Sequence, residues 1–307
     1  MIEQGIGETR AVLVDRGEIV EARIQREGVI PAGTVLAARL VSTGRNAVAR
    51  AGGEDYLLPK GAPGVTEGAT LTIEVTREVI GGGEPWKRPL ARVTEAAPAA
   101  APALAGSSIA FPAPRDPLEA AGWSDLLDEA RSGIILFPGG ELRVALTPAM
   151  TLIDVDGHLP PEQLALAGAQ SAARAIRRHG ISGSIGIDLP TISGKEARQA
   201  VAAAVDAILP QPFERTAVNG FGFLQIVCPR RRASLFELAA DRAAFEARAL
   251  LRRAARETGA ITLVAHPAVV AALRPEWLAR LGGQVGGTVT LRADASLAMS
   301  AAYAQRS

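Results

Sequence analysis

Two short apolar segments that each end in an aspartate constrain the fold of this chain more than any other feature. Residues 150–157 contain the first segment, which ends at Asp154, and residues 183–190 contain the second, which ends at Asp188. Between them, residues 161–179 have the Ala-, Gln- and Arg-rich composition of a helix. A strand, a crossover helix and a second strand form a βαβ unit, whose strands run parallel in one sheet.

The two aspartates of this unit are the first candidate site. Ligand-binding groups of open α/β sheets gather at the carboxyl ends of the strands, so Asp154 and Asp188 are expected to lie side by side. Neighbouring carboxylates repel each other and need a proton or a cation between them, and Mg²⁺ prefers such oxygen ligands together with water and substrate phosphate. The alternative for each aspartate is an Asx-turn or a helix N-cap, since both commonly follow apolar strands.

Composition limits the classes of protein that fit. The chain has 307 residues, 48% hydrophobic, which suffices for a sizeable core and about two domains. Its net charge of +1 means that any nucleic-acid surface depends on local clusters of Lys and Arg. A single cysteine, Cys228, excludes an internal disulfide and argues against a zinc cluster. With no signal-peptide pattern and no apolar stretch of ~18 residues, a cytoplasmic protein without a membrane partner is expected.

The N-terminal third reads as short strands. Residues 1–27 form a hairpin region, in which residues 8–26 turn at Arg16 and Gly17. Residues 28–95 contain five β-like segments separated by Gly-rich turns, as in a small OB-type barrel. Such barrels bind single strands by stacking bases on aromatic side chains along a basic groove. The candidates are Tyr56, for which core packing is the alternative, and Trp86, Arg77, Lys87 and Arg88.

The rest of the chain alternates helical and strand patterns. Residues 96–117 are an Ala/Pro-rich linker, residues 118–245 a predicted catalytic α/β domain, and residues 246–307 a small α/β tail. Helices are expected over residues 117–132, 161–179, 193–209, 236–258 and 267–281, and strands over residues 134–137, 142–146, 220–226, 261–265 and 288–293. Ser193 and Glu196 have the spacing of a capping box, and His266 is expected to start a helix.

Three consecutive arginines follow the strand predicted after Asp188. Arg230, Arg231 and Arg232 are candidates for a phosphate clamp, because guanidinium groups bind phosphate oxygens in pairs. The alternative is a solvated basic turn.

Several of these segments resemble the ribonuclease E/G family. Residues 152–157, LIDVDG, resemble the family's Ile-Asp-Val-Asn-Ser-Gly motif, and residues 185–189, IGIDL, resemble its second catalytic strand. Residues 220–225, GFGFLQ, and the arginine-rich turn are similar to its Arg-Phe-Gly-Leu-Leu-Glu segment. The order of a hairpin, an OB barrel, a linking region, a DNase-I-like catalytic domain and an α/β tail also agrees. The resemblance is dense only from about Gly139 to Leu235.

The resemblance implies a Mg²⁺-dependent endoribonuclease that cleaves single-stranded RNA. It implies that Asp154 and Asp188 hold the metal, which would activate a water for in-line attack on phosphorus. It places Asp156 at the family's asparagine beside the first aspartate, as a further catalytic residue. It also matches Arg77 and Lys87 to basic RNA-contacting positions of the barrel.

Some positions depart from the family's pattern. His158 and Leu159 replace a Gly-Arg pair, Thr191 replaces a second acid, and Gly220 replaces an arginine. The paired cysteines of the zinc link between subunits are missing, which leaves a homo-oligomer without that link open. Most of the region that senses a 5′ monophosphate is replaced by the linker. The alternative function is therefore an RNA-binding protein of the same family with weakened cleavage.

Overall fold

The computed structural model describes residues 1–81 and 87–306, and the chain divides into two compact units. The first unit is discontinuous and combines Met1–Glu27, Gly106–Leu127 and Leu238–Ser307. The second combines Gly28–Ala105 and Asp128–Glu237. The N-terminal region and the C-terminal tail, expected as separate parts, thus belong to the same unit, and the predicted catalytic domain over residues 118–245 extends into that unit at both ends.

A four-stranded sheet in the first unit contains the N-terminal hairpin. Its strand order is β3-β2-β1-β9, with bounds β1 (Ile2–Gln4), β2 (Glu8–Asp15), β3 (Glu18–Arg26) and β9 (Ser108–Ile109). The predicted hairpin is confirmed, with positive φ angles at Arg16 and Gly17 in its turn. β9 lies inside the predicted linker and pairs in parallel with β1, so the linker is partly built into this sheet.

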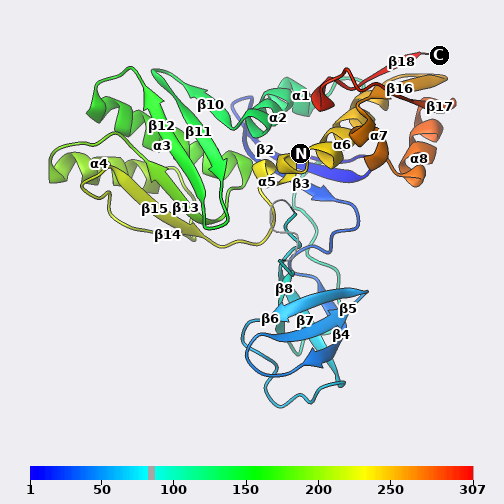
Figure 1. Cartoon of the computed structure of the whole chain (residues 1–307), viewed down its shortest axis with the longest axis horizontal. Helices are drawn as coiled ribbons and strands as arrows, with labels where there is room; N and C mark the ends of the chain where they lie inside the picture. The colour runs from blue at the N-terminus through cyan, green and yellow to red at the C-terminus, as the bar shows by residue number, and fades with distance from the viewer. Residues whose placement is uncertain (82–86, 307) are drawn as a thin grey trace. The chain divides into compact units, whose positions relative to one another are not determined.

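The C-terminal segment forms a small α/β layer of the first unit (Figure 1). Its sheet has the order β17-β16-β18, and Trp277 and Leu281 lie buried in the core beside it. The elements are α6 (Arg242–Ala254), β16 (Ile261–Ala265), α7 (Pro267–Ala272), α8 (Pro275–Val285), β17 (Val289–Ala293), η1 (Met299–Ala301) and β18 (Tyr303–Arg306). The prediction that His266 starts a helix is confirmed, since its Nδ1 accepts a hydrogen bond of 3.1 Å from the N–H of Ala268.

Three predicted helices are interrupted. The helix predicted over residues 117–132 is α1 (Pro117–Ala120) and α2 (Trp123–Ser132), separated at Gly122, whose φ is 93°. The one predicted over residues 236–258 is α5 (Leu235–Ala240) and α6, and the one over residues 267–281 is α7 and α8, which restarts at Pro275. Proline cannot continue a helix, because it lacks an N–H and disfavours helical geometry in the preceding residue.

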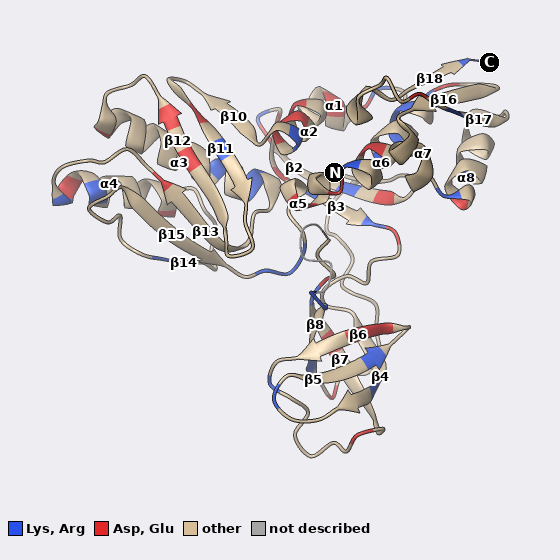
Figure 2. Ribbon diagram, in the orientation of Figure 1, with Lys and Arg blue, Asp and Glu red and all other residues tan. Residues whose placement is uncertain are grey.

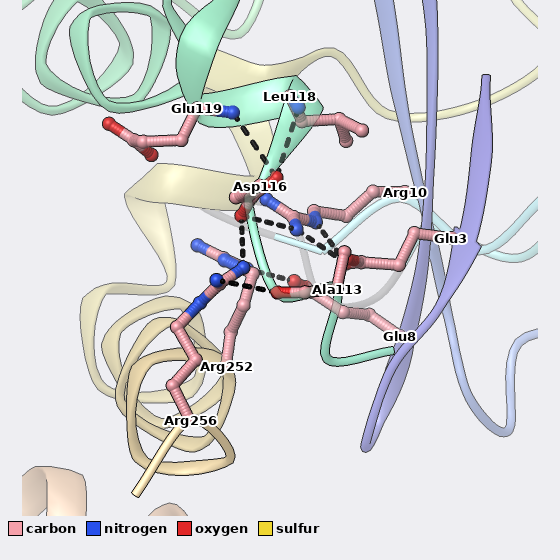
Figure 3. A network of polar contacts seen from close by, with 9 residues as sticks. All are labelled: Glu3, Glu8, Arg10, Ala113, Asp116, Leu118, Glu119, Arg252 and Arg256. Atoms are coloured by element: carbon pink, nitrogen blue, oxygen red, sulfur yellow. Dashed lines mark hydrogen bonds and ion pairs between the residues drawn. The ribbon is translucent and has the colours of Figure 1, made fainter. Parts of the chain in front are cut away.

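A buried network of charges ties together the three segments of the first unit (Figure 3). Arg10 donates to Glu3 at 2.7 Å through Nε and contacts Asp116 at 3.2 Å, and Arg256 donates to Asp116 at 2.7 Å. Trp123 is buried, and the Arg10 guanidinium lies 4.8 Å from the centre of its ring. Cationic groups on an aromatic face add to the stability of such a cluster.

Asp116 gives this network a pH dependence that can be measured. Its carboxylate caps α1 through the N–H groups of Leu118 and Glu119. Burial alone would raise the pKa of Asp116, but Arg10, the Glu119 N–H and Arg256 hold that pKa below its ordinary value of 3.8. The unfolded chain therefore binds this proton more tightly than the folded chain does. The stability contributed by Asp116 is present above about pH 4 and is lost as pH falls through the folded-state pKa.

We expect Asp116→Asn, which keeps the helix cap, to lower the free energy of unfolding by about 2 kcal/mol at pH 7, as for hydrogen bonds to charged groups. The difference from wild type should shrink between pH 5 and pH 3. Urea unfolding of both proteins at each pH measures it. A difference that stays constant down to pH 3 would contradict the prediction.

The predicted barrel is present as a closed five-stranded barrel in the second unit. Its strands are β4 (Val35–Ser42), β5 (Ala47–Ala51), β6 (Glu54–Leu58), β7 (Thr70–Arg77) and β8 (Leu90–Val93). They close in the order β4-β5-β6-β8-β7, and β6 and β8 are parallel. Small and aliphatic side chains fill the interior, among them Leu40, Ala49, Leu58 and Ile73.

A six-stranded sheet forms the other part of the second unit (Figure 1). Its order is β10-β11-β12-β13-β15-β14, with β10 (Ile134–Phe137), β11 (Gly140–Leu146), β12 (Thr151–Gly157), β13 (Gly183–Asp188), β14 (Glu214–Arg215) and β15 (Phe223–Cys228). The helices are α3 (Pro161–His179) and α4 (Lys195–Asp206). The predicted βαβ unit is confirmed as β12, α3 and β13, whose strands are parallel.

The two faces of this sheet differ. Ile153, Val155 and Ile187 are buried on the face that α3 covers. α3 approaches so closely that a Cβ built on Gly168 would lie 2.3 Å from Cγ1 of Val155, which explains a glycine inside this helix. Because side chains alternate along a strand, Leu152, Asp154 and Asp156 of β12 and Gly186 and Asp188 of β13 share the opposite face. We call this second face the open face.

One helix start differs from the prediction, and another has a capping pair that was not predicted. The expected capping box at Ser193 and Glu196 is wrong, because α4 begins after Gly194, which has no side-chain capping bond. A reciprocal pair instead precedes α5: the N–H of Glu237 donates to Oγ of Ser234 at 3.2 Å, and the N–H of Ser234 donates to the Glu237 carboxylate at 2.8 Å.

Candidate site on the open face of the six-stranded sheet

Asp154 and Asp188 occupy matching positions on neighbouring strands. They are register partners in the parallel β12–β13 pair, and both side chains are exposed. Neighbouring strands lie about 4.8 Å apart, and register partners point to the same face. The structure therefore brings together the two aspartates that the sequence predicted to be side by side.

Neither aspartate is a cap. Within the described residues, the carboxylates of Asp154 and Asp188 have no hydrogen bond or ion pair, and the N–H of Leu189 donates to Gly222 instead. The Asx-turn and N-cap alternatives are thus wrong for both. Asp156, two residues along β12 on the same face, accepts a hydrogen bond of 2.9 Å from the N–H of Gly157. Among the residues that the structure describes, no group of three or more His, Cys, Asp or Glu side chains has a metal-binding arrangement.

A cation that the sequence interpretation missed lies beside the acids. Arg143 of β11 is the register partner of Asp154, and Glu141 is that of Asp156. The Arg143 guanidinium hydrogen-bonds Glu141 at 2.7 Å; that bond and the Glu141 charge raise the pKa of Arg143, with smaller contributions from Asp156 and Asp154. Figure 2 shows basic residues in blue on β11 beside acidic residues in red on β12. This pairing depends on strand register, which no local sequence pattern indicates.

The three arginines of the predicted phosphate clamp do not lie beside the aspartates. β15 runs antiparallel to β13, so that Phe223 is the partner of Asp188, whereas Cys228 is the partner of Gly183. Arg230, Arg231 and Arg232 follow Cys228 and therefore lie at the opposite end of β13, roughly 16 Å from Asp188. Arg230 is also ion-paired with Glu237, and its Cδ lies 3.1 Å from where a Cβ of Gly183 would be.

The segment before β15, unlike the three arginines after it, lies at the end of the sheet where Asp188 lies. The strand predicted over residues 220–226 begins only at Phe223, and Asn219 to Gly222 form a turn. This turn places Phe221 beside the residues that follow Asp188, since the hydroxyl of Thr191 donates to the carbonyl of Phe221 at 3.4 Å. The side chain of Phe221 is 85% exposed.

In the barrel, one predicted aromatic contact is ruled out. Tyr56 is 2% exposed and belongs to the barrel core, so it is not available to stack on a base. The core alternative is correct because the alternation of β6 points Tyr56 inward. Trp86 lies outside the described residues.

Two groups of basic side chains on the barrel are candidates for contact with nucleic acid. Arg77 donates to the carbonyl of Arg88 at 2.9 Å, which places it beside the segment that contains Lys87. A second place, missed by the sequence interpretation, is a depression of about 520 Å³ lined by Arg45 and Lys60. These two side chains come from the β4–β5 loop and from the residues after β6, and both are exposed.

In the described part of the chain, the helices are too short or too polar to cross a membrane.

Comparisons with known proteins do not assign this chain to a family. No protein-family model matches the sequence, and a search of curated proteins finds no match.

Proposed function

We propose that this chain is a Mg²⁺-dependent endoribonuclease for single-stranded RNA that is similar to the ribonuclease E/G family. One observation supports the proposal most: Asp154 and Asp188 are in register on parallel strands, exposed, and without a partner in the described residues. Two such carboxylates repel each other, and a divalent cation between them relieves that repulsion.

The donor set fits Mg²⁺, which binds proteins through one or two carboxylates and keeps several waters and substrate phosphate as other ligands. Asp154 and Asp188 would hold the ion. When bound, it supplies Lewis-acid stabilisation of phosphoryl oxygen and lowers the pKa of a bound water. Arg143, beside Asp154, would offer its guanidinium to a phosphate oxygen of the RNA, and Asp156 would orient water through its carboxylate.

The barrel supports single-stranded nucleic acid as the substrate. Its closure joins the first, second, third, fifth and fourth strands in that order, which supports assigning it to the OB type. Such barrels track a backbone with basic side chains. We assign that role to Arg77 and Lys87, as the family resemblance implies, and to Arg45 and Lys60 beside the depression.

The second candidate function is RNA binding with little cleavage. It is favoured by the small number of candidate metal ligands at the site. The described residues contain no group of three or more His, Cys, Asp or Glu side chains that could hold a metal ion together. Both candidates predict salt-dependent RNA binding. Only the first predicts that the RNA is cut.

The test is incubation of the full chain with an internally labelled, unstructured RNA in Mg²⁺, in Ca²⁺, or in EDTA. We expect internal cleavage in Mg²⁺, none in EDTA, and little in Ca²⁺, whose longer bonds and larger coordination shell suit the site less well. A duplex of the same sequence should remain intact. Binding in every condition with no product in Mg²⁺ would establish the second candidate instead, and cleavage that persists in EDTA would contradict metal dependence.

A further inference from the structure

Phe221 is the most exposed large hydrophobic side chain in the described part of the chain. Its exposed fraction is 85%, above the 77% of Leu136 on the edge strand β10. Exposing an entire aromatic ring to water is unfavourable, since aromatic side chains are usually at least partly buried. A ring presented in this way is suited to cover a flat apolar surface.

The turn that carries Phe221 is fixed by hydrogen bonds. Oδ1 of Asn219 accepts from the N–H groups of Phe221 at 2.9 Å and Phe223 at 3.0 Å, and the N–H of Gly222 donates to the carbonyl of Asn219 at 3.2 Å. Gly222 has a φ of 89°, and a Cβ there would lie 2.2 Å from the carbonyl oxygen of Leu189. The turn thus requires glycine at this position and packs directly on the chain that leaves Asp188.

This turn lies at the acidic end of the sheet. The N–H of Leu189 donates to the carbonyl of Gly222 at 3.2 Å, and Phe223 is the register partner of Asp188. The Phe223 ring lies on the open face, because a Cβ built on Gly186 would be 2.5 Å from Cζ of Phe223. An apolar ring therefore borders Asp188 on the sheet, and a second, exposed ring stands at the adjoining rim.

We infer that Phe221 is a stacking platform for a nucleobase next to the phosphate that is cleaved. This inference rests on the proposed function, and it identifies how the site would hold the base of its substrate. Every nucleobase has a π-face, so the platform predicts binding of single strands with little dependence on base identity. A base in a duplex is stacked on its neighbours and is not available to Phe221, so the site selects unpaired RNA.

The experiment measures binding apart from cleavage, in the full chain carrying Asp188→Asn. Oligouridine is titrated against this parent, Phe221→Ala, Phe221→Tyr and Leu13→Ala, the last as a control for losing an exposed hydrophobic side chain on β2 of the first unit. Phe221→Ala should raise Kd between about 5-fold and 150-fold, the range expected for one base–aromatic stack. The Kd of Phe221→Tyr should stay within about 3-fold of that of the parent, and the Kd of Leu13→Ala should equal that of the parent.

A direct signal comes from Phe221→Trp in the same background. The emission added by this tryptophan should change when oligouridine binds, and it should not change with inorganic polyphosphate, which has the charge but no bases. Equal Kd values for Phe221→Ala and its parent would overturn the inference and leave the nuclease proposal standing. If Phe221→Ala changes only the oligomeric state, the ring belongs to a protein interface and the inference is also overturned. Wild type that binds no oligouridine in Ca²⁺, in which little cleavage is expected, overturns both proposals.

Discussion

Replacing Asp154 or Asp188 with asparagine is expected to reduce Mg²⁺-dependent cleavage of single-stranded RNA by at least about 100-fold. One metal ligand contributes several kcal/mol of transition-state stabilisation, and each 1.36 kcal/mol corresponds to a factor of ten in rate. Asparagine keeps the size of the side chain but removes the charge that holds the cation. Because both carboxylates are exposed and without a partner in the described residues, the free energy of unfolding should change by less than about 0.5 kcal/mol.

The matched control is Glu196→Gln, which removes an exposed acid from the first turn of α4. It should cleave at the wild-type rate. Asp156→Asn introduces the amide that the ribonuclease E/G family has beside its first aspartate. Comparing its cleavage rate with that of wild type shows whether the additional negative charge of Asp156 speeds or slows cleavage. Full activity in both Asp154→Asn and Asp188→Asn would rule out the proposed metal site, whereas equal losses in Glu196→Gln would point to a general effect of charge.

The largest effect on stability is expected for Arg10→Ala, which should lower the free energy of unfolding by about 3–5 kcal/mol. Glu3 is 0% exposed, and Arg10 is 1% exposed, so the substitution leaves a buried carboxylate without its cation. It also removes the guanidinium from the face of Trp123. Urea denaturation of wild type and variant measures the difference.

Two further variants test the reason for that loss. Replacing both partners, in Glu3→Leu with Arg10→Met, should recover much of the stability, because no unpaired charge is then buried. Arg92→Ala breaks the exposed Arg92–Glu74 pair of 2.6 Å on the barrel and should have little effect, since solvent screens such pairs. A double variant no more stable than Arg10→Ala would mean that packing on Trp123, not the uncompensated charge, dominates.

Local sequence patterns predicted the centre of the candidate site well. The helix expected over residues 161–179 is α3, with the same bounds, and the strands on either side of it have the predicted pairing. Apolar periodicity depends only on residues that are close in sequence. The βαβ rule holds for nearly all chains, because such connections are right-handed and bring consecutive parallel strands together. The position of Asp154 beside Asp188 followed from them.

The errors concern features that depend on distant parts of the chain. The separation of Arg230 from Asp188 could not be predicted, because the direction of β15 cannot be read from its own residues; the same direction places Phe221 at the end of the sheet where Asp188 lies. Arg143 was missed because its pairing with Asp154 is a matter of register. Tyr56 is core because of the alternation of β6 within a closed barrel.

The discontinuity of the first unit has a consequence for synthesis on the ribosome. The core around Ile6 contains Leu250, Leu263 and Trp277, which emerge only after the barrel and the six-stranded sheet have been translated. Domains generally fold as they are synthesised, and contacts between distant segments form slowly. The nascent N-terminal hairpin must therefore wait, with apolar side chains uncovered, for the last part of the chain, and a prematurely terminated product would expose it to chaperones and proteases.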